Sequence, residues 1–225
     1  MSKIVWNELA NRVFETGVSK GVLYPQVSGA YPKGVAWDGL TTVTESPSGA
    51  EPTKLYAANT VHAVLLSAEE YAATIEAYMY PDEFGPCNGE AEVVAGVTIG
   101  QQTRQTFGFS YVTQIGDSSG NTDHGYKIHI VYGCVAAPSE RSHATINDSP
   151  EAETMSWEIS TTPVNVPGFK PTATFTINSL TTDAEKLKAV EDVLYGTADA
   201  EPKLPMPEEL MTLLGVTGEE NGAEG

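Results

Sequence analysis

Histidine and carboxylate side chains are the groups in this chain that could hold a metal ion or move a proton. Three of the four histidines are close in sequence: His124 follows Asp123, and His129 and His143 come next, with Asp148 nearby. On a strand His124 and His129 point to opposite faces, and no pair has the i, i+4 spacing of two ligands on one helix face. The pattern indicates surface or edge-strand histidines, so we expect no metal site.

Oxygen-bearing side chains at every second position resemble the start of a calcium loop. They are Asp117, Ser119, Asn121 and Asp123. Such a loop needs a bidentate glutamate at about its twelfth position, and none stands there in this sequence. The segment is therefore predicted to be a solvated turn, and we expect no cofactor.

Nucleophile and acid–base patterns are also weak. Ser142 and His143 are adjacent but lack the context of a nucleophile elbow. With 30 acidic residues, some carboxylates lie together by chance, so a glycosidase-like pair carries little weight. Trp6, Trp37 and Trp157 could stack on sugars, but Trp157 lies in the apolar phase of a predicted strand. The sequence predicts that the chain is not an enzyme.

Four stretches alternate apolar and polar residues with a period of two, which is typical of antiparallel strands with one buried and one wet face. Their apolar positions are Phe107, Phe109 and Tyr111; Tyr126, Ile128, Ile130 and Tyr132; Met155, Trp157 and Ile159; and Ala173, Phe175 and Ile177. The turn-rich run between the first two predicts a hairpin. Shorter strands are predicted at 21–24, 34–37, 41–45 and 90–98.

Helical signals occur at two places. Residues 61–81 are predicted to form a strand, one helical turn and another strand, because Ser67 and Glu70 resemble a helix start. A longer helix is predicted from Thr182, paired with Glu185 in a capping box, to a stop at Gly196. Its apolar stripe, which should lie against a sheet, consists of Leu187, Val190 and Leu194.

The composition predicts two parts: a β domain over residues 1–196 and an acidic C-terminal extension over residues 197–225. The extension has seven acidic residues against Lys203. A short helix is predicted from Pro207 to Leu214, and disorder from Gly218 to Gly225. Because the whole chain has a net charge of −18, we expect it to repel phosphate backbones and to bind no nucleic acid specifically.

Localisation signals are absent from the sequence. No apolar run approaches the roughly 18 residues of a membrane helix, and the start of the chain does not read as an export signal. We therefore expect no membrane contact. Cys87 and Cys134 are expected to be free and buried in a reducing cytoplasm, with a single disulfide as the alternative.

A loop is predicted at Glu45–Thr53, where proline, serine and glycine are frequent. Long loops in compact domains are usually functional or mobile, and this one has no catalytic side chain. We expect it to reach a neighbouring subunit. The hypothesised interface residues are Glu45, Pro47, Ser48, Glu51, Pro52 and Tyr56.

Several ordered segments carry a family resemblance. They are ETGVSKGVLYP at 15–25, GVAWDGL at 34–40, ESPSGAE at 45–51, ATIEAY at 73–78, YPDEF at 80–84, TFGFSY at 106–111, GYKIHIVYG at 125–133, NDSP at 147–150 and SWEISTTPV at 156–164. Together they resemble the major tail proteins, or tail tube proteins, of long non-contractile-tailed phages of Gram-positive bacteria. The resemblance covers Trp6 to Gly196.

The resemblance implies a mainly β subunit, an antiparallel sandwich or barrel with one flanking α-helix and an extended interaction loop. Six such subunits would form a ring, and rings would stack around a tape measure protein into a tube that conducts DNA without binding it specifically. Further implied partners are the tail terminator and the distal tail protein. The implied location is the virion tail, and the host cytoplasm during assembly; no catalytic residues are implied.

A carbohydrate-binding or adhesin-like β-sandwich is the alternative. It would use exposed aromatic side chains as a platform, for which Tyr24, Tyr31 and Trp37 are the candidates. Such a module would bind sugar as a monomer, whereas a tube subunit must associate with copies of itself.

Overall fold

The protein is mainly β, with 46% strand, 11% helix and antiparallel sheets. The structure is a computed structural model that describes residues 4, 6, 12–118, 120, 124–146, 148 and 152–216. The predicted mainly β class is confirmed at this level, and the structure has two helices, a longer one and a short C-terminal one, at the two places where the sequence predicts them. Within the described residues, no helix is long and apolar enough to span a membrane.

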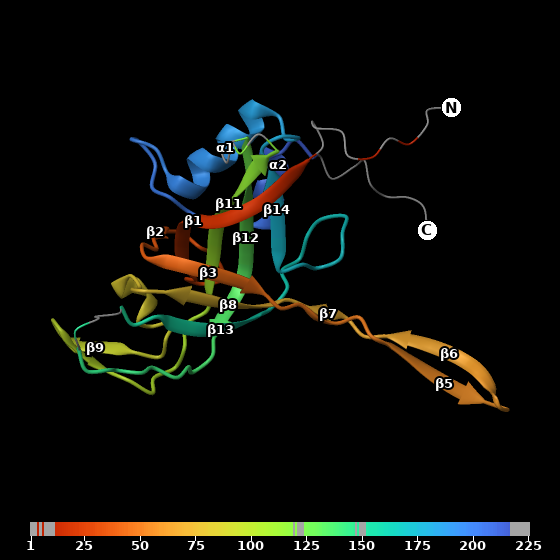
Figure 1. The fold of residues 1–225 in the computed structure, drawn as a ribbon, viewed down its shortest axis with the longest axis horizontal. Helices are drawn as coiled ribbons and strands as arrows, with labels where there is room; N and C mark the ends of the chain where they lie inside the picture. The colour runs from red at the N-terminus through yellow and green to blue at the C-terminus, as the bar shows by residue number, and fades with distance from the viewer. Residues whose placement is uncertain are drawn as a thin grey trace.

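The main sheet has eight strands in the order β2-β1-β11-β12-β13-β8-β3, with β14 also beside β12 (Figure 1). The predicted hairpin is confirmed, because β11 and β12 pair antiparallel. The strands are β1 (Val13–Pro25), β2 (Val35–Ala36), β3 (Leu40–Glu45), β8 (Ala72–Ala77), β11 (Phe107–Asp117), β12 (Gly125–Ala136), β13 (Met155–Thr161) and β14 (Thr174–Asn178).

Strand β12 has two different neighbours along one edge. Its first half pairs with β14, and its last residues pair with β13. Gly133 lies between these halves with a φ of +63°, and a Cβ there would be 2.3 Å from the carbonyl oxygen of Thr162. Since glycine alone adopts this conformation without strain and no side chain fits, Gly133 lets β12 change partner.

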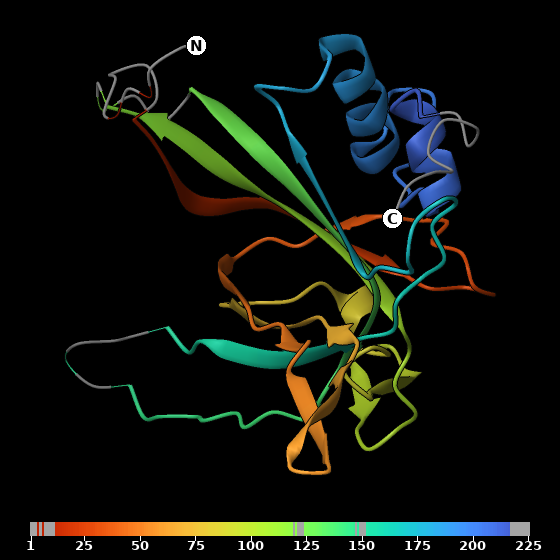
Figure 2. The same ribbon diagram turned by 90° about the vertical axis from the view of Figure 1, so that its right-hand side faces the viewer.

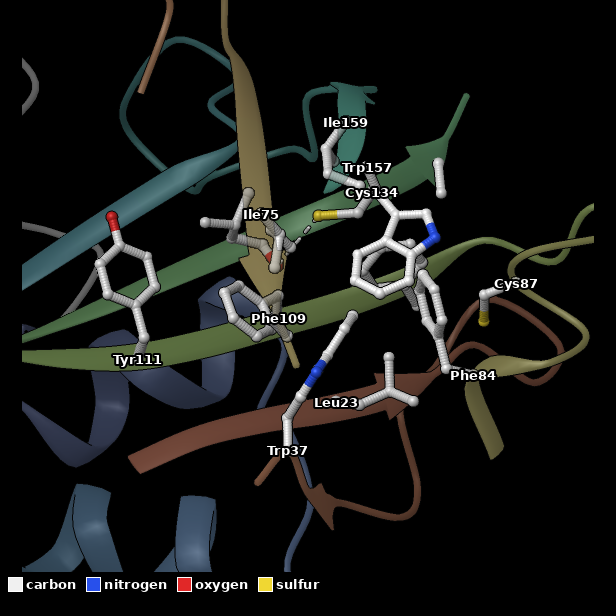
Figure 3. Close-up of a cluster of buried hydrophobic side chains, with 14 residues drawn as sticks. Leu23, Trp37, Ile75, Phe84, Cys87, Phe109, Tyr111, Cys134, Trp157 and Ile159 are labelled. Carbon is white, nitrogen blue, oxygen red and sulfur yellow. Dashed lines mark hydrogen bonds between the residues drawn. The ribbon is translucent and has the colours of Figure 1, made fainter. Parts of the chain in front are cut away.

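A first core cluster packs against one face of the main sheet (Figure 3). The Trp37 ring lies 4.6 Å from the Phe84 ring and 5.6 Å from the Trp157 ring, between centroids. The backbone N–H of Trp37 donates to the carbonyl of Gly21 at 2.8 Å, which continues the antiparallel pairing of β1 with β2. Trp157 is only 2% exposed, which confirms its expected place in the core.

The two cysteines contribute to this same cluster. Cys87 and Cys134 are buried and unpaired, as expected. Burial in apolar surroundings disfavours the charged thiolate and raises the pKa of Cys87 to about 12. Both are therefore inert core residues.

A second core cluster lies on the opposite face of the sheet, beneath helices α1 (Ala184–Tyr195) and α2 (Pro207–Leu213) (Figure 2). The prediction that β11 and β12 are wet on one face is therefore wrong. In β11 even Ser110 is 0% exposed and Val112 is 1% exposed. The reason is small side chains: a Cβ on Gly108 would be 2.2 Å from Leu204 Cδ2, so the C-terminal segment packs directly on the strand.

Helix α1 has the predicted stripe, with Leu187, Val190 and Leu194 buried. Its N-cap is Asp183 and not Thr182: the Asp183 side chain accepts hydrogen bonds from the backbone N–H groups of Glu185 and Lys186, at 3.1 and 3.2 Å. A carboxylate at this position satisfies otherwise unpaired donors of the first turn.

The segment after Gly196 shares the second core. Leu204 and Leu210 are 2% and 0% exposed, and the Tyr132 hydroxyl donates to the carbonyl of Pro205 at 2.8 Å. The short predicted helix is present as α2. The expected division at residue 196 thus falls inside a packed region, while Gly218 to Gly225 lie outside the described residues.

Three small paired elements lie outside the main sheet. The segment expected as one strand at 90–98 is a hairpin of β9 (Ala91–Val94) and β10 (Val97–Ile99), preceded by the 3-10 turn η2 (Asp82–Phe84). The other two pairs are β4 (Ser48–Gly49) with β7 (Glu69–Glu70), and β5 (Pro52–Ala57) with β6 (Thr60–Leu66).

Candidate subunit interface

Strands β3 and β8 continue beyond the body as a long two-stranded ribbon, which we call the arm (residues 46–71; Figures 1 and 2). Along it, Thr44 is opposite Thr74, Ser48 opposite Glu70, and Pro52 opposite Leu66. The loop predicted at Glu45–Thr53 is therefore wrong, because this segment is one side of a paired ribbon.

The helical turn predicted at Ser67 is wrong for the same reason. Glu69 and Glu70 form β7, opposite Gly49 and Ser48. A Cβ on Gly49 would lie 2.3 Å from the carbonyl oxygen of Ala68, so the two sides of the ribbon approach closely here. Cross-strand pairing overrides the weak helix signal of Ser67 and Glu70. Local residue spacing alone contains no information about this pairing.

Both faces of the outer arm, β5 and β6, carry exposed apolar side chains. Residues opposite one another share a face, which places Leu55 and Leu65 on one face and Tyr56, Val64 and Leu66 on the other. Their exposed fractions are 44% and 55% on the first face and 69%, 52% and 72% on the second. Two-stranded ribbons are marginally stable in water, and contiguous exposed apolar surface marks an interaction site.

The charge of the outer arm differs from that of the rest of the chain. Residues 52–66 include Lys54 and His62 but no aspartate or glutamate, although the whole chain has a net charge of −18. The outer arm is thus an apolar, weakly basic projection of an acidic molecule, suited to contact an acidic and apolar partner.

The six hypothesised interface residues all lie on the arm or at its root, and all are exposed. Glu45 lies at the end of β3, at the root of the arm, whereas Tyr56 lies on β5 in the outer arm. That these residues contact a neighbouring subunit stays a prediction. They are Glu45, Pro47, Ser48, Glu51, Pro52 and Tyr56.

Sequence reasoning missed the apolar residues of β6, which form the other half of the outer arm. The signal was the run from Ala63 to Leu66, where apolar residues stand at consecutive positions. An uninterrupted apolar run reads as a buried strand, so the pattern could not reveal that this one is exposed on both faces.

At the root of the arm, Glu45 enters a polar cluster of side chains from four strands. The Tyr111 hydroxyl donates to Glu45 Oε1 at 2.6 Å. The His129 ring stacks on the Tyr111 ring with centroids 4.6 Å apart and an interplanar angle of 4°, and its Nδ1 lies 3.7 Å from Glu45 Oε1. His129 lies on the central strand β12 with a side chain 13% exposed, so its expected surface or edge position is wrong.

Glu15 of β1 completes this cluster on the other side of His129. The Thr113 hydroxyl donates its only proton to Glu15 at 2.6 Å, so it accepts a hydrogen bond from His129 Nε2 at 3.0 Å. This arrangement leaves Nδ1 unprotonated toward Glu45 in the neutral ring. Lys127 forms an ion pair with the second oxygen of Glu15.

Burial and these contacts shift the acid–base behaviour of the cluster. Burial lowers the pKa of His129 below its ordinary value, although the carboxylates of Glu45 and Glu15 act in the opposite direction. Burial acts to raise the pKa of Glu15, but hydrogen bonds from Lys127 and Thr113 outweigh it, and the pKa is lowered. The pKa of Tyr111 is raised by burial and by its bond to Glu45, so Tyr111 stays a donor that anchors the arm root.

Two other histidines, His124 and His143, each lie beside a carboxylate. His124 Nδ1 lies 3.8 Å from an Asp117 carboxylate oxygen, and His143 Nδ1 lies 2.8 Å from Glu153. Within the described residues, no three His, Cys, Asp or Glu side chains gather as metal ligands. Ser119, Asn121 and Asp123 of the calcium-like spacing lie outside the described residues.

The aromatic platform expected for a carbohydrate-binding module is not on the surface. Tyr24, Tyr31 and Trp37 are 0%, 1% and 2% exposed. The polar atom of each side chain forms a hydrogen bond inside the fold. For example, the Tyr24 hydroxyl donates to the carbonyl of Leu194 at 2.9 Å. The sugar-stacking role predicted for these three residues is therefore wrong.

A comparison with known protein families and one with curated proteins find no match. The geometry of the arm and the charge of the chain are therefore the features that bear on function.

Proposed function

We propose that this chain is a structural virion protein that polymerises through its arm into stacked, hexameric rings, forming the tail tube of a long non-contractile phage tail. The observation that carries the proposal is the arm, an apolar ribbon exposed on both faces and projecting from a folded body. Such a ribbon gains stability when another surface covers it.

The shape of the molecule supports association with copies of itself. The arm projects along the longest axis, away from the body (Figure 1). A contact made by one end of a molecule with a different surface of the next copy is heterologous, and heterologous contacts generate rings or filaments. A tube of stacked rings contains both kinds of arrangement, since its subunits close into rings and its rings stack into a filament.

The charge supports a role as a conduit. A formal net charge of −18 repels DNA phosphates, so a lumen lined by some of these carboxylates would let DNA pass without adhering. In this proposal the partners are the tape measure protein inside the tube and the tail terminator and distal tail protein at its ends. The protein would assemble in the host cytoplasm and function in the virion tail.

Replacing the outer arm tests the proposal. Pro52 and Leu66 are opposite one another, so residues 52–66 can be exchanged for an Asn-Gly turn, which favours a tight hairpin. We expect wild-type protein at high concentration to form rings or hollow rods by negative-stain electron microscopy, and the arm-exchanged protein to stay a folded monomer.

Circular dichroism and gel filtration provide the control for folding. Normal tubes from the arm-exchanged protein, or a wild-type protein that stays monomeric at every concentration and with coexpressed tape measure protein, would contradict the proposal.

A further inference from the structure

An apolar groove of about 670 Å³ lies between helix α2 and the turn that precedes β14. The turn is closed by a hydrogen bond from the backbone N–H of Phe169 to the carbonyl of Val166 at 3.1 Å, and it leaves Phe169 55% exposed. Mostly apolar grooves of this size are typical of binding sites. Further apolar residues of its wall are Phe175, Met211, Leu214 and Val216.

The charge at this groove is positive. Lys170 lines it, and Lys186 of α1 lies near its edge, where a Cβ on Gly215 would be 2.5 Å from the Lys186 ammonium nitrogen. The ion pairs formed by lysines within the described residues involve neither of these two. The groove therefore favours an apolar segment that also carries a carboxylate.

Such a segment precedes β1 in the chain. Ile4 and Trp6 are 68% and 74% exposed. The other two tryptophans of the chain are each 2% exposed, so Trp6 is the one whose indole is available to a partner. Residues two positions apart in an extended segment share a face, and Glu8 continues the spacing of Ile4 and Trp6. An extended segment thus presents two apolar side chains and a carboxylate together.

We infer that the groove between α2 and the turn before β14 receives the N-terminal segment around Trp6 from another copy of this chain. The inference rests on the proposed self-assembly and names a contact between neighbouring copies. In this contact Trp6 lies against Phe169, and Glu8 lies toward Lys170. A tryptophan seated in an apolar pocket is among the side chains that contribute most to the stability of an interface.

Two other segments of the chain fit this groove less well. The charged residues of the outer arm are Lys54 and His62, so the arm would meet Lys170 with charge of the same sign. The residues after Val216 include three glutamates but no large apolar side chain, so they would leave the apolar wall uncovered. The segment around Trp6 supplies both features.

The N-terminal segment of a chain is poorly placed to fill the groove of the same chain. Val13 lies opposite Asp117 of β11, and Phe175 lies level with Ser110 of that strand, through β12. Their separation along and across the sheet is about 27 Å. The residues from Trp6 to Val13 span at most about 24 Å and would have to turn back over the face that α1 and α2 cover. Figure 2 shows the start of β1 and α2 on opposite sides of the molecule.

Cross-linking between two single-cysteine variants tests the inference. Trp6→Cys places a thiol on the N-terminal segment, and Phe169→Cys places one in the groove. The native Cys87 and Cys134 are buried and do not interfere. After mixing, assembly and mild oxidation, we expect a disulfide-linked dimer containing one chain of each variant, identified by mass spectrometry.

Met79→Cys is the matched control for Phe169→Cys. Met79 is 63% exposed and lies after β8, where its carbonyl accepts a hydrogen bond from Trp37 of the first core cluster. We expect it to give at least tenfold less of the mixed dimer. If tubes form and the groove thiol cross-links no better than this control, the groove contact is wrong although self-assembly stands. If wild-type protein forms no assembly at all, the proposed function fails and the inference fails with it.

A chain that carries both Trp6→Cys and Phe169→Cys separates contact within a chain from contact between chains. Oxidised at a concentration below that needed for assembly, it should stay without a disulfide. A disulfide inside the dilute monomer would overturn the assignment of the groove to another copy.

Substitutions at the contact test its chemistry. Trp6→Ser should raise the concentration needed for assembly at least roughly tenfold. Glu8→Lys and Lys170→Glu should each raise it by up to roughly fivefold, and the chain carrying both charge changes should return close to wild type. An unchanged assembly concentration in Trp6→Ser would overturn the inference, and a double charge variant no better than the single ones would overturn the pairing of Glu8 with Lys170.

Discussion

Making the outer arm polar should weaken assembly without unfolding the subunit. We choose Tyr56→Ser with Leu66→Ser, because these side chains are 69% and 72% exposed on the same face of the ribbon. Neither takes part in the two core clusters. The folded monomer therefore loses little packing, while the assembled state loses the burial of both side chains.

The magnitude follows from the exposed area. Full burial of a large apolar side chain contributes about 1.5–3 kcal/mol. With roughly 70% of each side chain still exposed in the monomer, assembly adds about 1–2 kcal/mol per residue. The double variant should thus lose about 2–4 kcal/mol per contact, and since about 1.4 kcal/mol corresponds to tenfold, the critical concentration should rise at least roughly 30-fold.

Sedimentation of assembled protein over a concentration series measures this critical concentration. Leu180→Ser is the control, because Leu180 is 46% exposed on the body and its replacement should leave the critical concentration within about twofold. Equal critical concentrations for the wild type and the double variant, with the fold intact by circular dichroism, would refute the role of this arm face.

Three further predictions concern the body. Gly133→Ala should destabilise the folded protein by about 1–3 kcal/mol or more, because the φ of Gly133 is +63° and the Thr162 carbonyl oxygen lies 2.3 Å from the Cβ position. Gly168→Ala should cost less, since Gly168 has a φ of +77° but open space at the Cβ position. Thermal unfolding of both variants measures the difference. Burial lowers the pKa of His129 below 6.5, so the stabilising contribution of the neutral ring is full above that value and is lost as pH falls through it. Urea unfolding at about pH 7.5 and 5.5 should therefore show a smaller loss on acidification in His129→Gln than in the wild type, and an equal loss would contradict the assignment. Ending the chain after Gly196 should expose the second core and leave a protein that fails to fold cooperatively, because Leu204 and other buried side chains are removed; a two-state unfolding transition in the shortened chain would show that the β domain is independent.

Much of the β framework could be read from local pattern. Period-two alternation located β11, β12, β13 and β14 because side chains of a strand point alternately to two faces. Helix α1 was marked by apolar residues at helical spacing and by Gly196 at its end. These signals depend on neighbouring residues, which the sequence displays directly.

What covers each face of a strand was decided only by the tertiary structure. The small residues of β11 alternate with Phe107, Phe109 and Tyr111 and read as a wet face, yet the segment around Leu204 packs on them. The alternation of apolar and polar residues likewise could not show whether Tyr24, Tyr31 and Trp37, the candidates for a sugar-binding platform, lie inside or on the surface.

The arm shows most clearly which features the sequence determines and which only the tertiary structure decides. The sequence by itself determined an acidic chain of short strands and marked Glu45–Thr53 as an unusual connection. Only the folded chain decided that this segment pairs with residues 65–73 and leads into an arm that extends past the body. The physical reason is that strand pairing joins residues distant in sequence. In addition, whether an apolar run is exposed depends on which other segments pack on it and not on its own amino-acid sequence.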